Sequence, residues 1–438
     1  MPAFSAFFHR DRLKRWACGN CPFHVKFGNF SRKHMLYAYT YHWLGWPQPD
    51  QVFEPKGAGA SVYAEFARTK IGGALKLAHP NVVVRVGVLA PDPHSDSTEA
   101  PLAVVCEFPR GARDEELDLA HSLAWNFSRT ALLITLEPHR LIAWSCFQDP
   151  TQPEGKRRVC ELPTPVGFKP TGTPLQREVR DLLHWVSLIT SRIQQKRPTQ
   201  FPADGRADAL LLKNLRYVRR ELLNLKPAPK KETLGREFCH DLLARIIFTQ
   251  FLFHRKDSDG HAFFSERLMK RLHEDGTLER YHNDLASVLT SKQDTYALFR
   301  WMDERFNGDL FPGKDGEDKD AKESAWQAEH DAVEQEHLDL LADLVSGRLD
   351  TSDRQLTLWP HYSFDTIPLE FISSVYEEFL TAEKLRDKAY YTDPFQGEGE
   401  DRLLVGLARK HLEREKQPRT GHRRAGQGRW PANPYRKE

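Results

Sequence analysis

The feature that most constrains this fold is a change of element type within residues 82–146. Four short stretches are rich in β-branched and aliphatic residues and are bounded by turn residues, which predicts strands. These stretches are residues 82–89, 102–108, 131–136 and 141–146. Between the second and third stretches, residues 116–127 repeat apolar side chains at helical spacing. This order of strand, helix, strand and strand predicts a small α/β domain.

Beyond this domain the apolar spacing becomes helical. Residues 238–255 are apolar on most sides, which predicts the central buried helix of a mostly helical domain at 175–345. One earlier helical stripe consists of Leu182, Val186, Ile189 and Ile193. Residues 313–331 are charged and poor in apolar side chains, so we expect a solvent loop or a frayed helix start there. The predicted fold class is α+β.

These patterns divide the chain of 438 residues into five parts. The parts are an aromatic-rich N-terminus with the α/β domain at 1–150, a Pro- and Gly-rich linker at 151–174, the helical domain at 175–345, a junction at 346–392 and a basic tail at 393–438. The tail has little apolar content, so we expect it to be disordered. Lys156, Arg157 and Arg158 form a basic run that we expect to lie in a solvated loop.

Composition excludes several classes of protein. A net charge of +2 excludes a uniformly basic nucleic-acid binder but permits a local basic face. No apolar run approaches the length of about 18 residues that a membrane span needs, and the N-terminus lacks a signal-peptide pattern. Six cysteines in a chain of this length do not make a disulfide framework. We therefore expect a cytoplasmic protein with reduced thiols and no membrane partner.

Cys18 and Cys21 have the spacing of half a zinc site. A structural zinc ion needs four ligands, which usually come from a second close pair. The sequence has no second pair of this kind, and His24 and His34 are the nearest other candidates. We therefore predict free thiols and no metal site.

A basic pattern lies within residues 210–225, where cations alternate with leucines. The cations are Lys213, Arg216, Arg219 and Arg220. At this spacing they can line one helix face, which is the form that a DNA-binding footprint takes. An ordinary solvated helix face is the alternative, and the pattern alone favours that simpler interpretation.

Near the end of the chain, residues 358–380 predict a turn followed by a capped amphipathic helix. Asp365 and Thr366 can accept hydrogen bonds from free amides at a helix start, and Pro368 is tolerated in a first turn. Apolar residues then recur every four positions, at Ile367, Phe371, Val375 and Phe379. The segment AYYT follows at residues 389–392.

This segment resembles the junction in adenine-N6 DNA methyltransferases of restriction-modification and phage-defence systems, including the type IIG restriction-methyltransferases. The matching positions are Ile367, Pro368, Glu370, Ile372, Ser373, Val375, Tyr376, Glu377, Phe379, Leu380, Tyr390, Tyr391 and Thr392. Asp393 stands where the family usually has proline. Residues 238–255 and 299–311 also resemble a buried helix and a turn of this family.

The resemblance implies double-stranded DNA as partner and S-adenosyl-L-methionine as cofactor, with Tyr390, Tyr391 and Thr392 forming part of the cofactor pocket. The family also needs an Asp-Pro-x-x-Gly-x-Gly motif and an Asn-Pro-Pro-Tyr motif. Residues 393–399 and 433–435 match these only in part, and too little apolar sequence separates them to build the catalytic sheet. We therefore expect a chain that is inactive alone. It is either the product of a truncated or frame-shifted gene or one half of a split enzyme, and in the second case a separate methyltransferase polypeptide is a possible partner.

The α/β domain resembles the nuclease-like N-terminal domains of such restriction proteins. In active members a strand presents Glu-x-Lys beside an upstream Asp, and the carboxylates hold Mg²⁺. The candidates here are Asp92 and Glu107, but the lysine is missing. A degenerate nuclease fold is therefore expected, with Glu107 as a solvent-exposed strand end if it has no catalytic role. A Mg-dependent endonuclease and a scaffold that binds DNA or a partner remain alternatives.

Overall fold

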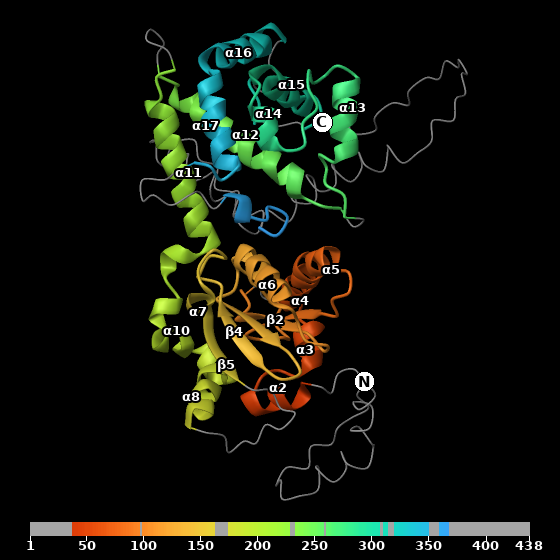
Figure 1. The fold of residues 1–438 in the computed structure, drawn as a ribbon, viewed down its shortest axis with the longest axis vertical. Coiled ribbons are helices and arrows are strands. Elements are labelled where there is room, and N and C mark those ends of the chain that lie inside the picture. Colours follow the sequence, from red (N-terminus) through yellow and green to blue (C-terminus); the bar gives the residue numbers. More distant parts are fainter. Residues whose placement is uncertain are drawn as a thin grey trace, which may run out of the picture. The chain divides into compact units, whose positions relative to one another are not determined.

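The structure, a computed structural model, describes residues 37–96, 99–162, 174–227, 233–257, 260–306, 310–313, 319–349 and 359–367 (Figure 1). Its contacts divide the chain into two compact units, each described separately below. The first, here called the α/β unit, comprises Met1–Asn214 and Leu358–Ile367; the second, the helical unit, comprises Leu215–Thr357 and Pro368–Glu438. The predicted α+β class is confirmed, because a five-stranded mixed sheet is combined with many helices.

The sheet of the α/β unit is built from consecutive strands in the order β1-β2-β3-β4-β5. The strands are β1 (Arg85–Leu89), β2 (Ala103–Glu107), β3 (Leu132–Leu136), β4 (Leu141–Ser145) and β5 (Arg158–Leu162). Strands β2 and β3 are parallel, and the other neighbours are antiparallel. A parallel pair needs a crossover, and α6 (Asp114–Phe127) provides it. The predicted order of strand, helix, strand and strand is thus confirmed.

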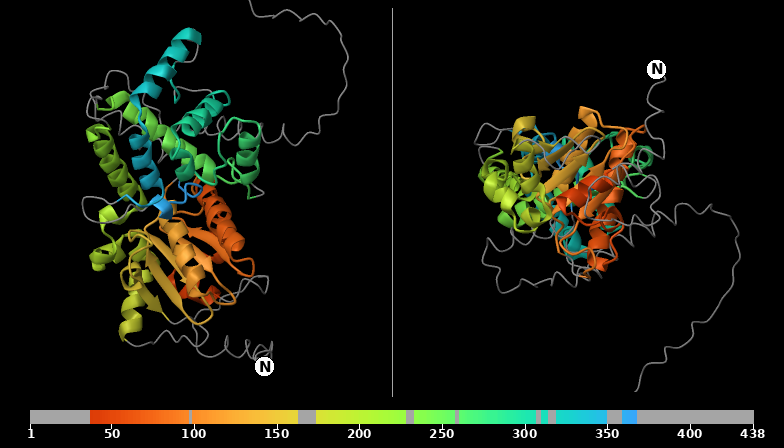
Figure 2. Two further views of the ribbon diagram at one scale, coloured as in Figure 1. Left: turned by 45° about the horizontal axis from the view of Figure 1, so that its top comes forward. Right: turned by 90° about the horizontal axis from the view of Figure 1, so that it is seen from below.

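Helices cover both faces of this sheet, as Figure 2 shows from two further directions. The helices of the unit are α2 (Ala38–Leu44), α3 (Pro49–Phe53), α4 (Ala58–Phe66), α5 (Gly73–Ala78), α6, α7 (Glu154–Arg157), α8 (Pro174–Leu183), α9 (Trp185–Ile189) and α10 (Arg192–Lys196). Single-turn 3₁₀ segments are η4 (Pro198–Gln200), η5 (Ala203–Gly205) and η6 (Trp359–His361). A π-helical segment, η3 (Ala67–Gly72), joins α4 to α5.

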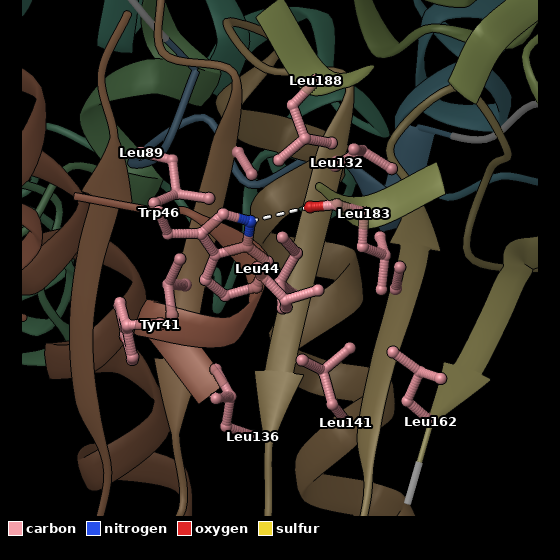
Figure 3. Packing of buried hydrophobic residues seen from close by; sticks show 14 of the residues in the cluster. Tyr41, Leu44, Trp46, Leu89, Leu132, Leu136, Leu141, Leu162, Leu183 and Leu188 are labelled. Atoms are coloured by element: carbon pink, nitrogen blue, oxygen red, sulfur yellow. Dashed lines mark hydrogen bonds between the residues drawn. The ribbon is translucent and has the colours of Figure 1, made fainter. Parts of the chain in front are cut away.

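Alternate strand residues enter the two cores, because successive side chains of a strand point to opposite faces. Ala103 and Val105 pack with α2, α3, α8 and α9, and Val104 and Cys106 pack with α4, η3 and α6. Figure 3 shows the first core, where the Trp46 indole Nε1 donates a 2.7 Å hydrogen bond to the Leu183 carbonyl oxygen. Residues far apart in sequence therefore close this face of the sheet.

Helix α3 lies very close to β1. A β-carbon at Gly87 would be 2.5 Å from the Val52 carbonyl oxygen, so only glycine allows this approach. Helix α2 ends at Gly45, which has the left-handed φ of 67° that favours glycine. Gly87 thus lets α3 pack directly on β1, and Gly45 ends α2 beside His184 and Trp185.

The helical unit is organised around a buried helix, α12 (Arg236–His254), as predicted. The other described helices are α13 (Glu266–Glu274), α14 (Leu285–Leu289), α15 (Lys292–Asp303), α16 (Lys319–Ala332) and α17 (Gln335–Val345). Helix α14 packs against α12 and α17. The long helix α11 (Ala207–Asn224) begins in the residues of the first unit and ends in those of the second.

A buried ion pair joins α12 to α16. The two terminal nitrogens of Arg245 donate to the two carboxylate oxygens of Glu329, and Arg245 Nε donates to the Leu310 carbonyl oxygen at 2.7 Å. The Tyr296 hydroxyl donates to Glu329 at 3.1 Å. Of the solvent loop or frayed helix start expected at 313–331, the loop is wrong for residues 319–331, because they form a helix that buries Trp326 and Glu329.

The linker expected at 151–174 is also wrong in its middle. Strand β5 pairs with β4 and buries Val159 and Leu162, because these apolar side chains fit the open edge of the sheet. The solvated loop expected for the basic run is wrong for Arg157, because its side chain is buried. Its Nη2 donates a 2.9 Å hydrogen bond to Asp118 Oδ1.

The predicted single stripe from Leu182 to Ile193 is divided between three short helices, α8, α9 and α10. Leu182 and Ile193 are buried, whereas Val186 and Ile189 are exposed. The chain leaves helical geometry at His184 and again at Ser191, so residues between them do not continue the stripe.

Four cysteines of the described chain are buried: Cys106, Cys146, Cys160 and Cys239. Burial raises the pKa of the Cys160 thiol to about 12. No helix in the described ranges is long and apolar enough to cross a bilayer.

Candidate functional site

The first candidate site lies at the end of β2, where Glu107 points to the face covered by α2 and α3. The Tyr41 hydroxyl donates a 2.9 Å hydrogen bond to Glu107 Oε1. Arg85, the partner of Glu107 in the strand register, places its Nη1 3.8 Å from Glu107 Oε2. The Arg85 guanidinium also lies 3.7 Å from the centre of the Phe53 ring. Glu107 is only 7% exposed, so the solvent-exposed strand end expected from the sequence is wrong.

Burial perturbs the acidity of this carboxyl group. It raises the pKa of Glu107 from 4.5 to about 7, although the Tyr41 hydrogen bond and the Arg85 charge both oppose the shift. Burial raises the pKa of Tyr41 in turn, and the adjacent Glu107 raises it further. The Tyr41 phenol therefore stays neutral and remains the donor. The site can hold one proton near neutral pH.

Asp92, the second predicted carboxylate, is not brought to this site. It is exposed in the turn after β1, where its side chain accepts a 2.9 Å hydrogen bond from the His94 amide. Arg85 pairs with Glu107 and Leu89 with Ala103, so Asp92 follows the opposite end of the β1–β2 pair. Four residue steps along a strand span about 13 Å, which is far too long for two ligands of one ion.

Within the described ranges, no three His, Cys, Asp or Glu side chains gather in a group that could hold a metal ion. The Mg-dependent nuclease alternative therefore gains no support from the geometry. Arg110, which follows the strand in place of a catalytic lysine, is exposed in a turn.

A carboxylate that the sequence patterns missed is Glu137, which directly follows β3. It is 6% exposed, and its oxygens accept hydrogen bonds from the Ala112 amide at 3.2 Å and from Arg140 Nε at 2.7 Å. The parallel pairing of β2 and β3 brings Glu107 and Glu137 to the same edge of the sheet. Only the parallel register could have indicated this, because the residues are thirty positions apart in the chain.

The second candidate site is the basic face of α11. Lys213, Arg216 and Arg220 are exposed, and their spacing of three and four residues places them on one side of the helix. Arg219 does not belong to this face, because its Nε donates a 2.8 Å hydrogen bond to His240 Nε2 on α12. The Arg220 guanidinium lies over the Tyr217 ring, 5.1 Å from its centre.

The other predicted residues lie outside the described ranges. They are Cys18 and Cys21, the cofactor-binding candidates Tyr390, Tyr391 and Thr392, and the tail at 393–438. Of the predicted junction helix, the structure describes the turn that ends at Ile367.

Comparison of the chain with protein-family models, with curated proteins and with solved structures gave no match.

Proposed function

We propose that this chain is the DNA-binding, N-terminal part of an adenine-N6 DNA methyltransferase of a restriction-modification or phage-defence system. The resemblance at residues 367–392 supports the family, and the basic face of α11 is the observation that carries DNA binding. On its own, the chain would bind duplex DNA without transferring a methyl group. Residues 390–392 would complete the S-adenosyl-L-methionine pocket of a separate methyltransferase polypeptide.

The physical basis of binding is counterion release. Each cation that neutralises a phosphate displaces a condensed counterion, so affinity falls steeply with salt and depends weakly on sequence. Lys213, Arg216 and Arg220 supply three cations on about two turns of one helix. Such contacts would position the duplex, and they would leave base recognition to other residues.

The test is a titration of labelled duplex DNA at several salt concentrations. The variant Lys213→Ala/Arg216→Ala/Arg220→Ala should bind more weakly and lower the slope of log affinity against log salt by about 2–3. The control Lys76→Ala/Arg192→Ala/Lys196→Ala removes three exposed cations from other helices and should keep the slope of the parent chain. Equal slopes for both variants would reject this face, and no binding of the parent chain at low salt would favour a protein-binding scaffold.

Catalysis is tested separately with radiolabelled S-adenosyl-L-methionine. The purified chain should transfer no label to DNA, and calorimetry should detect no cofactor binding. Mixing with a separately expressed methyltransferase half should restore cofactor binding. Turnover by this chain alone would contradict the proposed division of labour.

A further inference from the structure

The chain returns to the α/β unit through a short segment, residues 359–367, here called the latch. Four large side chains of the latch are almost fully buried: Trp359, Tyr362, Phe364 and Ile367, with exposed fractions of 1%, 1%, 0% and 2%. The Trp359 and Phe364 rings lie 5.1 Å apart. Four large buried side chains within nine residues show that the latch packs as part of the α/β unit.

The surface that receives the latch is centred on the end of α6. The Trp125 ring stacks on the Tyr362 ring, with centres 5.3 Å apart and planes at 20°. The next residue, Asn126, donates through Nδ2 to the His361 carbonyl oxygen at 2.9 Å and accepts at Oδ1 from the Ser363 amide at 2.8 Å. One buried amide thus pairs with the latch backbone on both sides of Tyr362, as a neighbouring strand would.

An ion pair closes the rim of this surface. Lys70 on η3 places its Nζ 2.6 Å from Asp365 Oδ1, and the two side chains are 11% and 16% exposed. The latch turns back at this point, because the Thr366 and Ile367 amides both donate to the Ser363 carbonyl oxygen. The π-helical segment changes the phase of the α4–α5 helix at Lys70.

We propose that Lys70, Trp125 and Asn126 form a peptide-recognition seat on the α/β unit, which the chain's own latch occupies in an exchangeable way. The seat recognises an aromatic residue, its flanking backbone groups and an acidic residue three positions later. This proposal does not rest on DNA binding.

Two buried hydrogen-bond donors in the latch provide a control for the experiments below. The Tyr362 hydroxyl and the Trp359 indole N–H find no hydrogen-bond partner within the described residues. Replacing Tyr362 by phenylalanine therefore keeps the stacked ring and removes a group that gains nothing in the seat. This variant is the matched control for loss of the ring.

The first experiment measures amide hydrogen exchange of the full chain. Peptides covering the latch should exchange slowly in the parent protein, and Asn126→Ala should accelerate them about tenfold or more because it leaves buried backbone groups unpaired. Lys70→Met should have a smaller effect, Tyr362→Phe none, and Lys76→Met none. Latch amides that exchange in the parent chain as fast as in a free peptide would overturn the proposal.

The second experiment tests exchange in trans with a fluorescein-labelled synthetic peptide of residues 357–368. A full chain carrying Tyr362→Ala/Phe364→Ala leaves the seat open and should bind the peptide at least about tenfold more tightly than the parent chain. A peptide with Tyr362→Ala should not bind. Equal affinity of the peptide for both chains would refute an exchangeable seat. So would a lack of binding to the variant, if its amide hydrogen exchange outside the latch matches that of the parent chain. If this variant does not fold, the hydrogen-exchange arms decide alone.

Discussion

The two units bury a glutamate in different ways. Glu107 of the α/β unit receives one hydrogen bond from a neutral phenol, and its nearest cation nitrogen is 3.8 Å away. Glu329 of the helical unit receives Arg245 on both oxygens and Tyr296 on one. The same side-chain type is therefore held with little charge compensation in one unit and with close compensation in the other. Removing a partner should expose this difference.

The largest effect is expected from Arg245→Met. It leaves Glu329 buried without its cation, which should destabilise the helical unit by about 3–5 kcal/mol. Urea denaturation measures the change in the free energy of unfolding, and hydrogen exchange of α12 amides reports the change within the helical unit. The matched control Arg300→Met removes an exposed pair with Glu323 and should cost about 1 kcal/mol or less.

A double variant sharpens the interpretation. Arg245→Met/Glu329→Leu removes both charges and should recover most of the lost stability, because a buried pair is close to neutral against apolar residues of similar size. If the double variant is as unstable as the single one, packing rather than charge compensation holds α16 on α12.

The next effect concerns Glu107 and pH. Folding raises its pKa from 4.5 to about 7, so the folded protein binds an additional proton between these values. Stability should therefore fall as pH rises through this window and then level off. Glu107→Gln removes this dependence and should be more stable than the parent by about 2–3 kcal/mol at pH 8, with the difference shrinking towards pH 4.5. Unfolding curves at several pH values measure it, and a pH-independent difference would contradict the raised pKa.

A smaller effect is expected from Tyr41→Phe. Loss of the phenol donor should raise the pKa of Glu107 further and reduce stability at pH 8 by about 1–2 kcal/mol. Tyr37→Phe is the comparison, because the Tyr37 hydroxyl donates to the Phe108 carbonyl oxygen at 3.1 Å and not to a carboxylate. Tyr37→Phe should reduce stability by about 1 kcal/mol, which is typical for a neutral hydrogen bond. This loss should be the same at pH 5 and at pH 8, because neither partner of the bond titrates there. Equal pH dependence of the two variants would show that the Tyr41 hydrogen bond does not alter the ionisation of Glu107.

The smallest effect is expected from Asp92→Asn. A charge at the far end of the strand pair lies beyond the screening length of about 8 Å at physiological salt, so the pKa of Glu107 should move by less than about 0.2. Carbon-13 NMR of the glutamate carboxyl groups measures this shift. A larger movement would mean that Asp92 approaches Glu107 and would revive the paired-carboxylate interpretation.

Much of the fold followed from local composition. The strands at 82–146 were predicted because β-branched and aliphatic runs bounded by turn residues suit a sheet that is covered on both faces, and the helix at 238–255 because it is apolar on most sides. Strand β5 was missed because Pro and Gly on either side made residues 151–174 look like a linker. Helix α16 was missed because its buried Trp326 and Glu329 stand among charged residues, and Glu329 is buried only by virtue of a distant arginine.

The candidate sites were harder to predict than the fold. Glu107 was identified, but its burial depends on Tyr41 and Arg85, which reach it through tertiary packing that no local pattern encodes. Arg219 was assigned to the exposed face by spacing alone, and its partner His240 lies on another helix. The helix predicted after Thr366 lies outside the described residues, and nothing local in the latch indicates Trp125 as a stacking partner.

The buried cysteines give each unit an internal reporter of opening. A thiol reagent attacks the thiolate, and burial both blocks access and suppresses ionisation, so labelling must wait for the surrounding structure to open. Cys106, Cys146 and Cys160 lie in the sheet region, whereas Cys239 lies on α12. After Cys18 and Cys21 are replaced by serine, the labelling kinetics resolved by mass spectrometry would time the opening of the two units separately in one tube.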